Sequence, residues 1–282
     1  MNVIDLVSSD DEDHDVPVVH RDRNLVSLYF SLQSATENLR NFRKLGIVLP
    51  RDLQNKVARM NYAAKYVCEY TALHRYVLSI DIGIKNLGFC LFDMANIQAT
   101  TKVKMLHWGV KELATDINDR HILTKTALSI REIFQTVKTI VYQMPVSLII
   151  EEQYINPRKL LSKVGIVNLQ IMAQVIALAP WDDCRIVHSA TTSAMIEDWF
   201  EINPIKRKRQ NVKNRYKVKK AISVNLVDNQ FEDSNLVDNM DEYKKVWDTS
   251  MKRDDMADCF IQGVVIILAN NSLLDLRHDL LK

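Results

Sequence analysis

The residues best suited to chemistry are carboxylates that interrupt or end apolar segments. Asp81 lies inside the segment Leu-Ser-Ile-Asp-Ile-Gly, and Glu151 and Glu152 end the segment Leu-Ile-Ile-Glu-Glu-Gln. Asp255 and Asp258 open a terminal helical pattern, and their three-residue spacing puts them on one face of that helix. A carboxylate in an apolar strand needs a proton, a partner or a metal ion. Acids clustered without His or Cys would select Mg²⁺ or Mn²⁺, ions that serve phosphoryl chemistry.

Each acid also has an ordinary interpretation when it is taken alone. Acids at a helix start complement the helix dipole, and acids at a strand end are simply solvated. Asp81 could be an edge-strand residue. Three acidic positions on separate elements of one sheet are harder to explain in this way, and they favour a shared metal site.

Basic residues gather in one segment. The net charge is +2, but residues 1–15 hold six acids and no Lys or Arg, which leaves 37 bases against 29 acids in the remainder. A solvated loop or a localisation signal would explain a basic run, and so would a polyanionic partner such as nucleic acid. Nine of the fifteen residues 206–220 are basic: Lys206, Arg207, Lys208, Arg209, Lys213, Arg215, Lys217, Lys219 and Lys220.

Composition excludes several classes of protein. Only six glycines and six prolines occur, and neither G-x-x-x-x-G-K-[ST] nor G-x-G-x-x-G is present, which argues against glycine-rich nucleotide sites and turn-dense β folds. The longest apolar run, residues 263–269, is far shorter than a bilayer requires, so no membrane span is expected. Four scattered cysteines without C-x-x-C argue against a zinc site or a disulfide framework.

The elements that must position the acids follow from hydrophobic periodicity. Apolar runs predict strands at 76–81, 88–92 and 104–110, in an antiparallel meander, and further strands at 146–150 and 185–188. Helical patterns cover 122–143 and 168–178, and a helix ends the chain. This order predicts an α/β domain over residues 76–282 with a mixed sheet flanked by helices.

Two further segments precede that domain. Residues 1–23 form an acidic tail, expected to be disordered, and Val3-Ile4-Asp5-Leu6 resembles a SUMO-interacting motif. Residues 24–75 are helical in pattern: Leu25, Leu28 and Leu32 begin an apolar face, Gly46 stops one helix and Pro50 opens the next. This pair resembles a SAP-type DNA-binding module, and the alternative is a hairpin packed on the main domain.

Three motifs together resemble those of the RNase H-like Holliday junction resolvases, above all the fungal mitochondrial group related to bacterial RuvC. They are Ser-Ile-Asp-Ile-Gly-Ile-Lys-Asn-Leu-Gly (79–88), Ile-Glu-Glu-Gln (150–153) and Arg-Asp-Asp-Met-Ala-Asp-Cys-Phe (253–260). The resemblance covers about residues 76–270 and implies an RNase H-like five-stranded mixed sheet with an N-terminal SAP-like module. Asp-x-Gly-x-x-Asn is also similar to the first phosphate loop of actin-like ATPases, which need further glycine-rich segments that this chain lacks.

The resemblance implies a site and a reaction. Asp81, Glu151, Asp255 and Asp258 match the family's metal ligands, for Mg²⁺ or Mn²⁺ with two ions per site. The bacterial order of residues would place Glu152 in the position of Glu151, and Asp254 matches an additional acid of the fungal group. The implied activity is metal-dependent cleavage of four-way DNA junctions, with the basic insertion 203–220 on DNA.

The resemblance also implies an assembly and a compartment. Symmetric cleavage of two strands needs two active sites related by a two-fold axis, so a homodimer is expected. The fungal likeness implies a mitochondrial location, while the acidic N-terminus, unlike a presequence, leaves a nuclear location open. Alternative functions are another RNase H-like nuclease, acting on RNA/DNA hybrids or in transposition, and a catalytically inactive junction-binding protein.

Overall fold

A mixed five-stranded sheet forms the centre of the protein in a computed structural model. The structure describes residues 23, 26–27, 29–50, 52–53, 55–113, 118–119, 121–152, 163–201 and 212–281. The sheet order is β3-β2-β1-β4-β5. β1 pairs antiparallel with β2 and β2 with β3, whereas β1 pairs parallel with β4 and β4 with β5, so the predicted meander and mixed sheet are confirmed. The strands are β1 (Tyr76–Ile82), β2 (Asn86–Asp93), β3 (Lys104–Glu112), β4 (Val146–Glu152) and β5 (Cys184–His188).

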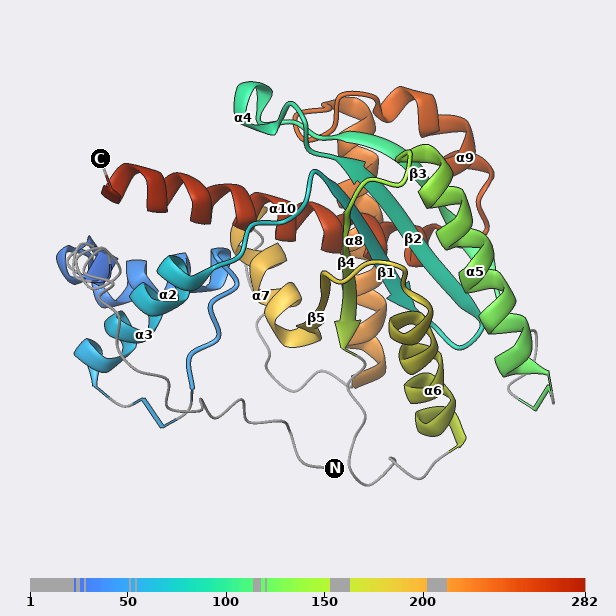
Figure 1. Cartoon of the computed structure of the whole chain (residues 1–282), viewed down its shortest axis with the longest axis horizontal. Helices are drawn as coiled ribbons and strands as arrows, with labels where there is room; N and C mark the ends of the chain where they lie inside the picture. The colour runs from blue at the N-terminus through green and yellow to red at the C-terminus, as the bar shows by residue number, and fades with distance from the viewer. Residues whose placement is uncertain are drawn as a thin grey trace.

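Helices cover both faces of this sheet (Figure 1). On one face α5 (Ile122–Ile140) and α6 (Lys163–Leu178) pack on the alternate strand residues that include Ile80 and Ile150. The opposite face carries α7 (Ser189–Trp199), α8 (Val212–Glu232) and α10 (Arg253–Leu281). Shorter elements complete the described chain: α4 (Ile97–Thr100), a 3₁₀ turn η2 (Met240–Tyr243) and α9 (Lys244–Thr249).

α10 is the helix that joins the two ends of the molecule. Its 29 residues run along the sheet and continue to the N-terminal helices, as Figure 1 shows. By length and composition it could cross a membrane, the one described helix to do so. Most of that apolar stretch is buried, with Ile261, Val264 and Val265 at most 2% exposed. Its apolarity is therefore that of a core helix.

The N-terminal helices are α2 (Ala35–Lys44) and α3 (Lys56–Glu69). Gly46, at φ +69°, ends the first, as predicted. The predicted start of the second at Pro50 is wrong, because α3 begins only after Asn55, whose side chain caps it by accepting a hydrogen bond from the Ala58 N–H. Leu32 does not join the expected apolar face, since it is 80% exposed. Leu25 and Leu28 lie outside the described residues.

Candidate active site

Strand register brings the first two acids to the same level of the sheet. Ile80 pairs with Ile150 across the parallel strands β1 and β4, so Asp81 and Glu151 follow side by side. Successive side chains of a strand alternate between faces. Ile80 and Ile150 pack under α5 and α6, so Asp81 and Glu151 face α10.

Glu152 lies on the other side of the sheet. It is the last residue of β4, and its carboxylate lies 3.9 Å from Nε2 of His188, with both side chains about half exposed. The alternation of the strand therefore separates the two neighbouring glutamates. Glu151 shares a face with Asp81, and Glu152 does not.

The first turns of α10 bring the remaining acids to the same place. Burial holds the pKa of Asp81 well above its usual range, and the charges of Asp258, Glu151 and Asp255, in that order, raise it further. Carboxylates influence one another in this way only when they are close in a partly dehydrated setting. Four acids from β1, β4 and α10 thus form one electrostatic cluster.

Two side chains orient Asp255 within this cluster. Asn86, the first residue of β2, donates a hydrogen bond from Nδ2 to Oδ2 of Asp255 at 2.9 Å. Lys220, from the third turn of α8, places its ammonium 3.3 Å from Oδ1 of Asp255 and in direct contact with Asp254. Burial tends to raise the pKa of Asp254, but the hydrogen bond from Lys220 brings it below its usual value. The two contacts depend on tertiary packing, and the sequence patterns did not reveal them.

Removing Lys220 should destabilise the protein, because the repulsion between the carboxylates of the cluster is then no longer offset by its charge. Lys220→Met is expected to cost roughly 1–3 kcal/mol of unfolding free energy in EDTA at neutral pH, because two carboxylates lose their cation. The loss should shrink when Mn²⁺ is added, since the metal replaces the missing charge. Thermal denaturation with and without Mn²⁺ checks this, and an equal loss under both conditions would contradict it.

The close approach of α10 to the sheet depends on Gly88, which pairs with Asp81 in the β1–β2 register. A Cβ atom at position 88 would lie 2.4 Å from the backbone oxygen of Asp255. Backbone cannot yield as a flexible side chain can, so any larger residue would push the first turn of α10 away from β1. The glycine therefore sets the distance between the acids of the helix and those of the strands.

Gly88→Ala should accordingly damage the site more than the fold. A displacement of about 1 Å at reacting groups can cost on the order of 10²-fold in rate, and we expect a loss of that size in cleavage. Gly109→Ala, on the neighbouring strand β3, is the matched control, because its Cβ would meet only the ring of Phe89, at 3.3 Å. Comparable cleavage rates for the two variants would contradict this role for Gly88.

The chemistry of the acid cluster fits a hard divalent cation. Carboxylate oxygens are the ligands that Mg²⁺ and Mn²⁺ prefer, and a bound cation would relieve the repulsion recorded in the raised pKa of Asp81. Within the part of the chain that the structure describes, no three Asp, Glu, His or Cys side chains already converge closely enough to hold an ion. Lys220 supplies the positive charge at Asp255 in this arrangement.

The predicted DNA-contacting bases fall into three groups. Lys206, Arg207, Lys208 and Arg209 lie outside the described residues. Lys213, Arg215, Lys217 and Lys219 lie in the first two turns of α8. The third group is Lys220, whose ammonium lies against the acids of α10. The helix α8 therefore connects the described part of the basic segment, residues 212–220, to the acid cluster.

Comparisons with known proteins agree with this architecture. No protein-family model matches the chain, and no curated protein matches it significantly in sequence. The crystal structure of the yeast mitochondrial Holliday junction resolvase superposes with a TM-score of 0.58 at 16% identity, covering 85% of this chain and 95% of that one. Two further structures, both with junction DNA, match less well: Fowlpox virus resolvase (TM-score 0.39, 16% identity, 71% and 99% covered) and Thermus thermophilus RuvC (0.32, 14%, 49% and 85%). The first superposition, over 85% of this chain, shows that this protein shares the fold of that resolvase.

Proposed function

We propose that this protein is an endodeoxyribonuclease that resolves four-way DNA junctions by phosphodiester hydrolysis. One observation carries the proposal: the charges of Asp258, Glu151 and Asp255 act together on the buried Asp81, on a fold shared with a yeast resolvase. A nuclease of this kind needs clustered carboxylates near a basic DNA-binding surface. The fold alone does not specify a reaction, so the site must carry the argument.

In this proposal the four acids hold Mg²⁺ or Mn²⁺, with two ions per site. The ions, when bound, activate water and stabilise the leaving oxygen of the phosphodiester. Asn86 keeps the carboxylate of Asp255 turned toward the cluster. Lys220 offsets part of the negative charge of Asp254 and Asp255.

Substrate binding is assigned to two regions. The basic insertion 203–220 would contact phosphates, because it leads directly into α8 and ends at the acid cluster. The helical module 24–75 would contribute to the choice of branched DNA. Cutting two strands of a junction symmetrically requires two sites, so we propose that the protein acts as a homodimer.

Compartment and regulation are proposed on narrower grounds. The fold shared with a yeast mitochondrial resolvase supports a mitochondrial location. A nuclear location is the alternative. Residues 3–6, for which a SUMO contact is proposed, lie outside the described residues.

A panel of substrates tests the proposed function. Purified protein is incubated in Mg²⁺ with a synthetic four-way junction, a linear duplex of the same sequence and an RNA/DNA hybrid. We expect cleavage of the junction well above that of the other two. Preferential cleavage of the hybrid would assign the protein to another branch of RNase H-like nucleases. Tight junction binding without cleavage in Mg²⁺ or Mn²⁺ would make it a binding protein.

A further inference from the structure

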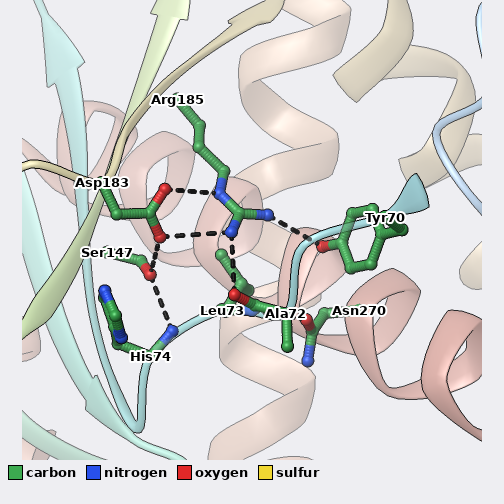
Figure 2. Close-up of polar contacts among 8 residues, drawn as sticks. All are labelled: Tyr70, Ala72, Leu73, His74, Ser147, Asp183, Arg185 and Asn270. Carbon is green, nitrogen blue, oxygen red and sulfur yellow. Dashed lines mark hydrogen bonds and ion pairs between the residues drawn. The ribbon is translucent and has the colours of Figure 1, made fainter. Parts of the chain in front are cut away.

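The connection between the helical module and the nuclease sheet is held by side chains. Residues 70–75 link α3 to β1 without regular structure of their own. Arg185, on the edge strand β5, donates to both carboxylate oxygens of Asp183, at 2.9 and 3.2 Å. The same guanidinium reaches across to the linker, donating to the hydroxyl of Tyr70 at 3.1 Å and to the carbonyl of Ala72 at 3.0 Å (Figure 2).

Two further hydrogen bonds hold the backbone of the linker. The backbone N–H of His74 donates to Oγ of Ser147 at 2.8 Å, and that hydroxyl in turn donates to Asp183 (Figure 2). The backbone N–H of Leu73 donates to the side chain of Asn270 on α10 at 2.9 Å. Consecutive backbone groups of the linker are thus bound to β4, β5 and α10. A chain held in this way does not act as a hinge.

The module is also held by contacts with α7 and α10. Arg43 of α2 forms an ion pair with Asp198 of α7 at 2.8 Å, and the indole of Trp199 donates to the carbonyl of Lys44 at 3.0 Å. Leu273 of α10 is buried among the apolar side chains of α2 and α3. α10 carries Asp255 eighteen residues earlier, which at 1.5 Å per residue places the module about 27 Å from the acids. One rigid helix spans that distance, which is about eight base pairs of duplex.

From these contacts we infer that Arg185 is a positioning residue that fixes the angle between the helical module and the acid cluster, and that this fixed angle favours branched over linear DNA. The inference rests on the proposed junction-resolving function. DNA that touches both the module and the acids must follow the path that their fixed geometry allows. A branched DNA and a straight duplex cannot both fit two contact sites that are held at a fixed angle. A fixed angle between the helical module and the acids therefore lets the protein bind one of these DNA shapes more tightly than the other.

The contacts of Arg185 explain why another cation would not replace it. The guanidinium uses Nε, Nη1 and Nη2 for four hydrogen bonds with three partners. Its side chain and that of Asp183 are each only 21% exposed, so the pair is partly shielded from water. A lysine ammonium is a point charge without the planar arrangement of donors in a guanidinium. It could donate to Asp183 or to Ala72, but it could not make all four hydrogen bonds.

The test compares Arg185→Gln with a matched control in the full-length protein. Arg75→Gln is the control, because Arg75, at the sheet end of the linker, also binds one carboxylate with two nitrogens, at 2.8 and 2.7 Å, but that carboxylate is Asp93 of β2 and not a group of the helical module. Spin labels at Lys65 on α3 and Gln135 on α5, both exposed, report the distance between module and sheet. Cys68 and Cys184, the partly exposed cysteines, are replaced by Ser in every sample.

Two readouts decide the inference. We expect Arg185→Gln to broaden the label-to-label distance distribution and to lower the ratio of junction to duplex affinity by about fivefold or more, while Arg75→Gln changes neither. An unbroadened distribution, or a broadened one with an unchanged affinity ratio, would overturn the role of Arg185. Should Arg185→Gln fail to fold, Arg185→Lys and Tyr70→Phe must give the same two changes in smaller degree. A wild-type protein without junction preference would instead refute the proposed function.

Discussion

Asp81→Asn is expected to abolish cleavage while leaving junction binding intact. The substitution keeps the shape of the side chain and removes one carboxylate charge from the place where β1 and α10 meet. Electrostatic groups at a reacting centre are worth on the order of 10³-fold in rate, and we expect the loss of Asp81 to cost at least that much. Binding depends on phosphate contacts elsewhere and should change little. Single-turnover cleavage and a binding titration in EDTA measure the two effects separately.

The chain supplies its own control for this experiment. Glu152→Gln removes the carboxylate next to Glu151 in the sequence. That carboxylate lies on the opposite face of the sheet, where it contacts His188. It should cleave junctions within a few-fold of the wild-type rate. Undiminished cleavage by Asp81→Asn, or equal losses in both variants, would remove the assignment of the acid cluster as the reacting centre.

Asp81→Asn should also stabilise the metal-free protein. The pKa of Asp81 is raised in the folded state, so the folded protein binds a proton more tightly than the unfolded chain does. Stability therefore falls as pH rises from the unfolded value, near 4, through the raised folded value. The asparagine variant lacks this loss. In EDTA its melting temperature should exceed that of the wild type at pH 7, and the two should converge as pH falls toward 4. A lower melting temperature at pH 7 would contradict the clustered geometry.

Neutralising the basic segment is expected to have the largest effect on DNA affinity. Phosphate contacts release counterions, so each lost contact lowers the dependence of log affinity on log salt by roughly 0.9. Changing Lys206, Arg207, Lys208 and Arg209 to Gln should therefore lower the slope by up to about 3.6. The control replaces four bases distant in sequence from this segment: Lys104, Arg131, Lys138 and Lys245. An unchanged slope for the first variant, or equal changes in both, would make the segment a localisation or solubility feature.

The sheet and its acids were predictable because their signals are local. Apolar runs fixed all five strands to within two residues, and the acids were visible as charges in segments that should have none. The register of β1 and β4 places Glu151 beside Asp81, on the same face of the sheet, and Glu152 on the opposite face. That register comes from the structure and not from the local sequence patterns. The metal-ligand role of the four acids stays a prediction, supported by their convergence.

Other features could not be read from local patterns. α7 contacts α2, α10, β4 and β5, so its buried residues do not form a single apolar stripe. The ion pairs of Lys220 join residues 34 and 35 positions apart in the sequence, and the linker contacts of Arg185 span more than 100 positions. Leu32 belongs to an apolar spacing that the packing of the helices does not use. Such contacts follow from tertiary structure.

Cutting of a four-way DNA branch by the acid cluster can be seen directly in the products. Each strand of a synthetic immobile junction is labelled in turn, and the products are resolved after a single turnover in Mg²⁺. We expect paired nicks at symmetric positions in two opposing strands, yielding two nicked duplexes, with a linear duplex of the same sequence left intact. Nicks that fall equally on all four strands and on the linear duplex, or cleavage that persists in Asp81→Asn, would contradict it.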